Sequence, residues 1–500
     1  MFRHPVPFVV ALIAGGWLAM PAAAQKPHEP TPGPTAEQVA KVVAECRKKL
    51  IFLRPAINPF TGQLEYSFSV REPIDSLPEI PFPHILLADR GGLQYFDPSR
   101  PGISLQFAFD TKLTDLNPKR ARAAKSLAFN SPTTYSARDL DLLESAETLT
   151  GPFGDADLEV LKTLKNLKNL STSGTVGPAG MKALADFPAL ERLHLVGRKF
   201  DRKSAAEGLE QLKSMKRLTQ LGIYNHPGLP EGTLETIGAL PALTHLELVN
   251  VKVARGRGNF AEALERAKSL TSLRLVELEL EMSGDRFCFK EFPVLAELSL
   301  EGSWTTDDWL KPVEQLKNLH SVTLNKTAVS DTGLRALSRL PLHSLVIVTT
   351  SRPATTRDNV APISGPGVVA VVKDLKSISV LGLDGVRLFP PVLVNKGPGE
   401  PFGAEKPEAP PIDAAATKAR KAETVAALKS LTGLRCLNLV RTGVTDEDVE
   451  WIVDLKSLEY LYVDAKVTPA CIAKIKAGLP KCTVERSPEF PALFGKEPPK

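Results

Sequence analysis

Cysteines and aromatic residues are scarce in this chain, and neither sign of charge dominates it. Aromatic residues make up 6% of the 500 residues, and the five cysteines are Cys46, Cys288, Cys436, Cys471 and Cys482. They form no CxxC pair and have no regular spacing, so neither a zinc site nor a disulfide framework is indicated. Lysine and arginine exceed aspartate and glutamate by only 62 − 57 = 5. Because nucleic-acid-binding proteins usually carry a dense basic face, we expect no nucleic-acid partner.

The chain also lacks an apolar run that is long enough for a membrane-spanning helix, which needs ~20 apolar residues. The run from Val6 to Met20 follows Arg3 and precedes small residues ending at Ala24. This order is typical of a secretory signal peptide, which we place at residues 1–24. A retained N-terminal anchor is the alternative. We therefore predict a secreted, periplasmic or cell-envelope protein with no membrane span after signal removal.

Leucines recur in the pattern L-x-x-L-x-L along most of the chain. Successive second leucines such as Leu273 and Leu298 are 298 − 273 = 25 residues apart. This step lies inside the window of ~20–29 residues for leucine-rich repeats. Weaker copies reach back to Leu127 and forward to Cys482, which we align with Leu461. We therefore place the repeat array at residues 121–485.

A helix start follows each strand-like segment. Ser330-Asp331 and Thr445-Asp446 precede apolar residues at helical spacing. A Ser or Thr oxygen can accept from free backbone N–H groups, and a carboxylate is favourable near the positive helix end. One such unit cannot bury its own leucines, but stacked units can. We predict an α/β leucine-rich-repeat solenoid, an arc or horseshoe with a parallel concave β-sheet, convex helices and a small N-terminal cap region.

Proline-rich segments and long steps divide the rest of the chain. Residues 25–34 are predicted as a tether, and residues 35–120 as an N-terminal cap or small subdomain that begins with a helix at Thr35. The step from Leu345 to Leu381 is 381 − 345 = 36 residues, and the next, to Leu437, is 437 − 381 = 56. The excess predicts loop insertions near 349–367 and 389–417. We expect residues 486–500 to form a C-terminal tail.

The repeats resemble the ribonuclease-inhibitor-like class of leucine-rich repeats, in particular secreted bacterial proteins with L-x-x-L-x-L-x-x-T-x-V-T-D units. The matching segments are Leu319–Asp331 and Leu434–Asp446, with Thr327 and Thr442 where other subtypes place Asn or Cys. The same repeat class occurs in F-box proteins, but this chain has no recognisable F-box. The resemblance implies a horseshoe and a binding role, and it names no ligand.

Two patterns could indicate chemistry, and each has a structural explanation. Gly256, Gly258 and Ala261 fit G-x-G-x-x-A, but a dinucleotide fold needs a doubly wound sheet, which a solenoid does not form. His194 and His245 share strand faces with Glu247, but strands two repeats apart lie ~10 Å apart, too far for one zinc ion. We predict no catalytic residue, no cofactor and no metal site.

A binding face is the sharper hypothesis. Side chains between the inward leucines point to the concave side of the sheet, because side chains alternate along a strand. A mixture of charged, Tyr and Arg residues is typical of protein interfaces. The candidate residues are Arg192, His194, Tyr224, His245, Glu247, Arg274, Glu297 and Glu301.

The composition and the repeats favour a non-catalytic exported scaffold that binds a protein partner, or a polysaccharide, through the concave face or the inserted loops. An extracytoplasmic enzyme with its site in residues 35–120 or in the insertions is the first alternative. A purely structural envelope protein is the second.

Overall fold

The computed structural model describes most of the repeat array. The described residues are 51–57, 64–70, 85–87, 103–107, 112–116, 118–197, 208–253, 264, 266–280, 292–349, 363–388 and 414–486. They belong to two units, Met1–Gly197 and Arg198–Lys500. Several predictions lie outside the described residues. These concern the signal peptide, the tether, the helix from Thr35, the Gly256 motif, most of both insertions and most of the C-terminal tail.

The first unit contains an antiparallel hairpin followed by a parallel sheet. Strand β1 pairs antiparallel with β2, and from β2 to β8 each strand pairs parallel with the next along the chain. In its core the rings of Phe107 and Phe129 are stacked with centroids 4.9 Å apart, and the ring of Phe153 meets that of Phe129 edge to face at 5.8 Å. Its strands are β1 (Ile51–Ile57), β2 (Leu64–Val70), β3 (Ile85–Leu87), β4 (Ile103–Phe107), β5 (Ser126–Phe129), β6 (Thr148–Gly151), β7 (Asn169–Thr172) and β8 (Arg192–Val196).

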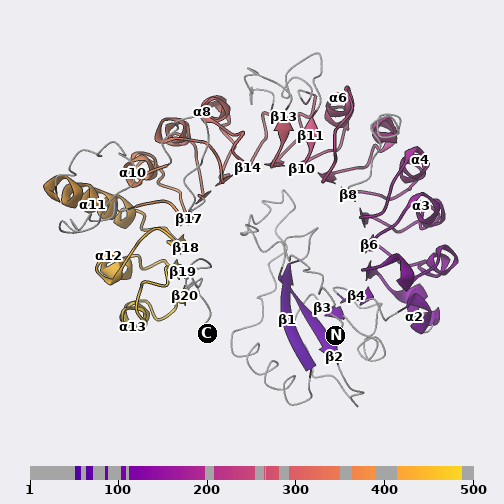
Figure 1. The fold of residues 1–500 in the computed structure, drawn as a ribbon, viewed down its shortest axis with the longest axis horizontal. Coiled ribbons are helices and arrows are strands. Elements are labelled where there is room, and N and C mark those ends of the chain that lie inside the picture. Colours follow the sequence, from indigo (N-terminus) through magenta and orange to yellow (C-terminus); the bar gives the residue numbers. More distant parts are fainter. Residues whose placement is uncertain are drawn as a thin grey trace, which may run out of the picture. The chain divides into compact units, whose positions relative to one another are not determined.

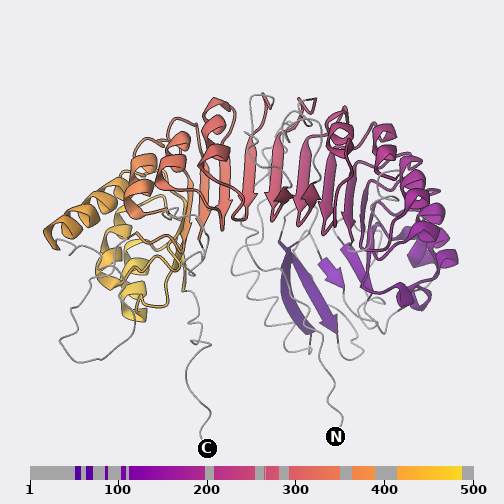
Figure 2. The ribbon, with the colours of Figure 1, turned by 45° about the horizontal axis from the view of Figure 1, so that its top comes forward.

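The second unit is a parallel sheet with helical segments on one side (Figure 1). Figure 2 shows its strands side by side. They are β9 (Gln220–Tyr224), β10 (His245–Val249), β12 (Ser272–Val276), β14 (Glu297–Glu301), β15 (Ser321–Asn325), β16 (Ser344–Val348), β17 (Val380–Asp384), β18 (Cys436–Asn438), β19 (Tyr460–Val463) and β20 (Thr483–Arg486). Strands β11 (Lys252–Val253) and β13 (Glu279–Leu280) form a separate parallel pair.

Most helical segments are one or two turns long and lie between consecutive strands. In the first unit they are η2 (Leu113–Asp115), α2 (Pro118–Ala123), η3 (Pro132–Thr134), η4 (Ala137–Leu142), α3 (Asp155–Leu161) and α4 (Pro178–Ala185). In the second they are η5 (Glu210–Ser214), α6 (Thr233–Gly238), α8 (Asp307–Leu310), η7 (Lys311–Gln315), α9 (Asp331–Leu334), η8 (Arg335–Leu337), α10 (Gly365–Val372), α11 (Ala414–Lys429), α12 (Asp446–Val449), η9 (Glu450–Asp454) and α13 (Pro469–Gly478). Helices α10 and α11 begin inside the two ranges predicted as loop insertions.

The register of the sheet follows the leucine spacing. Leu273 pairs with Leu298, and Leu298 with Val322. The inward leucines are fully buried, as at Leu273 and Leu300, both 0% exposed. The predicted α/β leucine-rich-repeat solenoid with a parallel sheet is therefore confirmed.

The last strand corrects one alignment. Leu461 pairs with Val484, not with Cys482. The reason is the helix end: Cys482 N–H donates to the Leu479 carbonyl at 3.0 Å, just as Leu458 N–H donates to that of Leu455 at 3.0 Å. Leu479 therefore ends a helix, as Leu455 does, and does not open the strand motif.

A left-handed residue follows most strands of the second unit. Asn225, Asn250, Glu277 and Lys326 have φ of 55, 52, 46 and 51°, and Gly302 takes the same place with φ of 120°. In each case the backbone N–H continues the ladder, as from Asn250 to the Val276 carbonyl at 2.8 Å. The chain thus makes a uniform sharp turn away from the sheet.

Aspartates link the helix starts of successive repeats. Asp307 accepts the backbone N–H of Ser330 at 2.7 Å and also its hydroxyl. Asp446 accepts the N–H and the hydroxyl of Thr468, each at 2.7 Å. The predicted Ser-Asp and Thr-Asp helix starts are confirmed, and Ser330 accepts from Thr332 N–H at 3.1 Å. The carboxylate, however, binds the cap of the following repeat.

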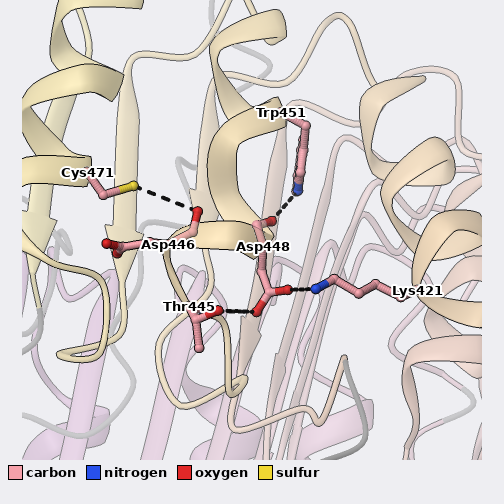
Figure 3. A network of polar contacts seen from close by, with 6 residues as sticks. All are labelled: Lys421, Thr445, Asp446, Asp448, Trp451 and Cys471. Carbon is pink, nitrogen blue, oxygen red and sulfur yellow. Dashed lines mark hydrogen bonds and ion pairs between the residues drawn. The ribbon is translucent and has the colours of Figure 1, made fainter. Parts of the chain in front are cut away.

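The repeat that begins its helix at Thr445 is capped by its own aspartate (Figure 3). Thr445 donates its N–H and hydroxyl to Asp448 at 2.9 and 2.8 Å, and the preceding helix, α11, begins with Ala414 instead of aspartate. Asp448 is 5% exposed and forms an ion pair with Lys421 of α11. The Cys471 thiol points to the Asp446 carbonyl at 4.0 Å.

Candidate binding face

The sheet brings six of the predicted residues onto one face of the second unit. We call Tyr224, His245, Glu247, Arg274, Glu297 and Glu301 the binding face. Strands β10 and β14 show the predicted alternation, with half-buried side chains between buried leucines. The face lies on the side of the sheet away from the helices, because the leucines between these residues point into the core.

Three of these residues contact one another. The Tyr224 hydroxyl donates to Oε2 of Glu247, and Nη1 of Arg274 lies 3.4 Å from the same oxygen. Glu247 and Arg274 are direct partners across β10 and β12. Burial, and then the negative charge of Glu247, raise the pKa of Tyr224. The phenol therefore keeps its proton and holds the carboxylate in place.

The two remaining glutamates have different surroundings. Glu301 forms an ion pair with Lys326 at 3.2 Å, and its side chain is 12% exposed. Glu297 lies between Ser272 and Ser321 in the register. Burial raises the pKa of Glu297, and a hydrogen bond from Ser272 opposes that shift. Within the described residues, Glu297 has no cationic partner.

His245, Arg192 and His194 have surroundings that differ from one another. Nδ1 of His245 lies 2.8 Å from the hydroxyl of Thr244. Arg192 and His194 lie on β8 of the first unit, in register with Asn169 and Ser171. Arg192 is half-buried, whereas His194 is only 2% exposed, so its ring is enclosed. The contacts of the binding face therefore join Tyr224, Glu247 and Arg274 and do not include these two residues.

Sequence reasoning missed the polar pairs at the strand ends. Lys326 contacts Glu301, and the Asn250 amide donates to the side-chain oxygen of Asn225 at 2.9 Å. The sequence does carry a signal for the turns at the strand ends, because Asn tolerates the left-handed conformation and three of these turns carry Asn or Gly. It could not be used without knowing where each strand ends.

The described residues hold neither a group of three or more His, Cys, Asp or Glu that could bind a metal ion nor a helix long and apolar enough to cross a membrane. What the binding face offers is hydrogen bonding and charge. Glu247 and Arg274 present fixed groups of opposite sign, and Glu297 adds a carboxylate without a cation.

No family model and no curated protein match the chain. Among solved structures, it is similar to an internalin of Listeria monocytogenes, with 17% identity, a TM-score of 0.36 and coverage of 76% of this chain and 83% of that chain. It is similar to a leucine-rich-repeat protein of Leptospira interrogans, with 16% identity, a TM-score of 0.36 and coverage of 73% and 91%. A chain of the Toll–Spatzle complex of Drosophila shares 13% identity, with a TM-score of 0.37 and coverage of 85% and 66%. The leucine-rich-repeat fold of this chain rests on its own parallel sheet, in which the buried leucines of successive repeats are paired.

Proposed function

We propose that this protein is an exported, non-catalytic scaffold of the ribonuclease-inhibitor-like class that binds a protein partner through the binding face. The signal-like N-terminus supports export, and the T-x-V-T-D units support the class. A polysaccharide partner, an enzymatic site in residues 35–120 or the insertions, and a purely structural role are the competing functions.

The Tyr224–Glu247–Arg274 cluster is the observation that carries this proposal. Tyr and Arg are enriched among the residues that dominate protein interfaces. Here Tyr224 and Arg274 are held by a shared carboxylate on neighbouring strands of a hydrogen-bonded ladder. Groups that are already ordered lose less conformational entropy on binding, so more of the contact energy appears as affinity.

A capture experiment with matched charge pairs tests the proposal. The purified chain is immobilised and exposed to cell-envelope extract, and the captured species are quantified for wild type and for Glu247→Ala/Arg274→Ala. The control is Lys429→Ala/Asp454→Ala, which removes an exposed pair of the same charges, 2.9 Å apart, on the helical side. We expect the first variant alone to lose a discrete protein, at unchanged thermal stability relative to the control.

The same experiment also separates a polysaccharide partner, a different binding site and a structural role. A species that survives protease treatment of the extract but not periodate oxidation is a polysaccharide. Capture that is equal for both variants removes the binding face as the site, and capture of nothing by the wild type supports a structural role.

A further inference from the structure

Two histidines that the binding face does not include lie side by side at the strand entrances. His320 directly precedes β15, and His343 directly precedes β16. The His343 N–H donates to the His320 carbonyl at 2.9 Å, so the two residues occupy the same position in adjacent repeats. Their ring centroids are 5.9 Å apart, and the rings are inclined at 78°.

The backbone that carries this pair is fixed on both sides. The His320 N–H donates to the Ala296 carbonyl at 2.9 Å, and the His343 carbonyl accepts from Ser379 and Val380 at 2.8 and 2.9 Å. The His343 ring is exposed and that of His320 half-buried. Within the part of the chain that the structure describes, no hydrogen bond or ion pair engages either ring, so the nitrogens are open to a ligand.

The ring separation suits a shared metal ion. Imidazole nitrogen binds Zn²⁺ at ~2.0–2.1 Å, which places the centres of two rings on one ion up to about 6 Å apart. Neighbouring strands ~4.8 Å apart bring two side chains of the same register within this range. Imidazole ligands suit Cu²⁺, Zn²⁺ and Ni²⁺, and among these Cu²⁺ binds most strongly.

We propose that His320 and His343 form a two-imidazole site for a divalent late first-row transition ion, with Cu²⁺ bound more tightly than Zn²⁺. The described residues add no third His, Cys, Asp or Glu ligand here. Water or a ligand from another molecule completes the coordination, and the ion is therefore exchangeable. The site is separate from the proposed binding face and does not depend on it.

Metal titration of the full chain tests this site. Metal-free protein is titrated calorimetrically with Cu²⁺ alone and with Zn²⁺ alone, for wild type, His343→Ala, His320→Gln and the double variant. Loss of either ring should weaken the binding of one equivalent of Cu²⁺ at least about tenfold. Even the removal of groups that only support metal ligands lowers metal affinity about 10–100-fold. The control, His245→Ala, should keep that equivalent.

Electron paramagnetic resonance of the bound Cu²⁺ gives a readout that a change in folding would not imitate. We expect nitrogen hyperfine structure from two imidazoles in the wild type and from one in His343→Ala, which removes an exposed side chain. Unchanged spectra and affinities in His343→Ala and the double variant would overturn the proposal. Zn²⁺ binding tighter than Cu²⁺ would overturn the stated order.

Discussion

Gly367 and Asp331 approach so closely that only hydrogen fits between them. A Cβ built on Gly367 would lie 1.9 Å from Oδ1 of Asp331. That carboxylate accepts the Ser364 N–H at 2.8 Å and so joins two successive repeats. The same overlap recurs between Gly333 and Asp307, at 2.2 Å. Glycine at the third helical position therefore makes room for the aspartate of the preceding repeat.

Gly367→Ala should destabilise the protein by about 1–3 kcal/mol, the usual cost of forcing extra atoms into a packed site. Chemical denaturation measures the loss. Gly433→Ala is the control, because a Cβ there would meet its nearest atom, the Ile378 carbonyl oxygen, at 3.9 Å. In the double variant Gly367→Ala/Asp331→Ala, the loss of stability should be smaller than the sum of the losses in the two single variants, because the overlapping carboxylate is gone. Full additivity would contradict the proposed contact.

Acid should weaken the link between Asp446 and Thr468. The Thr468 hydroxyl, and then its N–H, lower the pKa of Asp446. A carboxyl whose pKa is lower in the folded state stabilises fully above its unfolded value, ~3.9, and loses that contribution as the pH falls through the folded value. Hydrogen exchange at the start of α13 should therefore accelerate below about pH 4 in the wild type.

Asp446→Asn should show the faster exchange already at neutral pH and little further change on acidification. Glu447→Gln is the matched control, since this exposed glutamate lies in the same helical turn and does not contact Thr468. An equal acid response in Asp446→Asn and wild type would rule out the aspartate as its source.

Glu277→Gly should stabilise the protein. Glu277 is exposed and has φ of 46°, while Gly302 and Gly385 occupy the same place after β14 and β17. Relief of the left-handed conformation should exceed the entropy cost of glycine, with a net gain of up to about 1 kcal/mol. Thermal unfolding measures the difference. The reverse change, Gly385→Ala, should destabilise, because its Cβ would lie 2.5 Å from the Thr349 carbonyl oxygen. Stabilisation by both would refute the explanation.

Glu297→Gln should stabilise the protein at neutral pH. Burial raises the pKa of Glu297, so the folded state favours the protonated carboxyl. The charged form then costs stability as the pH rises above the unfolded value, ~4.3. The amide avoids this cost, and the advantage should vanish below about pH 4, as melting temperatures against pH would show. Glu301→Gln should not stabilise, because it removes the ion pair with Lys326.

The sequence could predict whatever depends on a single repeat. Leucine spacing gave the pairing of Leu437 with Leu461, because each inward leucine must meet its equivalent to be buried. The leucine spacing failed at Cys482. Leu479 could either end a helix or open the next strand motif, and only the length of the helix decides between these two roles. The spacing also gave the outward direction of Glu247 and Arg274, but not the Tyr224 hydroxyl that fixes the carboxylate.

Contacts between repeats were harder to predict. Ser330-Asp331 correctly marked a helix start, but the carboxylate of Asp331 binds Ser364, which is 33 residues further along the chain. The contact between the rings of His320 and His343 is likewise a contact between two repeats. Their adjacency depends on the exact register, in which a residue shift would turn one ring to the opposite side.

The self-contained cap at Thr445 gives this join between repeats other contacts than those at Ser330 and Thr468, where an aspartate of the preceding repeat binds the cap. The helix before it, α11, starts with Ala414, so no aspartate at that first helical position accepts both the N–H and the hydroxyl of Thr445. Helix α11, which packs against α10 and η9, instead reaches Asp448 with the long side chain of Lys421. An ion pair between Asp384 and Arg441, 2.6 Å apart, also crosses this join. The long side chains of Lys421 and Arg441 have more rotamer freedom than the short aspartate, serine and threonine side chains that link the repeats at Ser330 and Thr468. We therefore expect the second unit to bend more easily at this join than at the joins of Ser330 and Thr468 when it is pulled or bent.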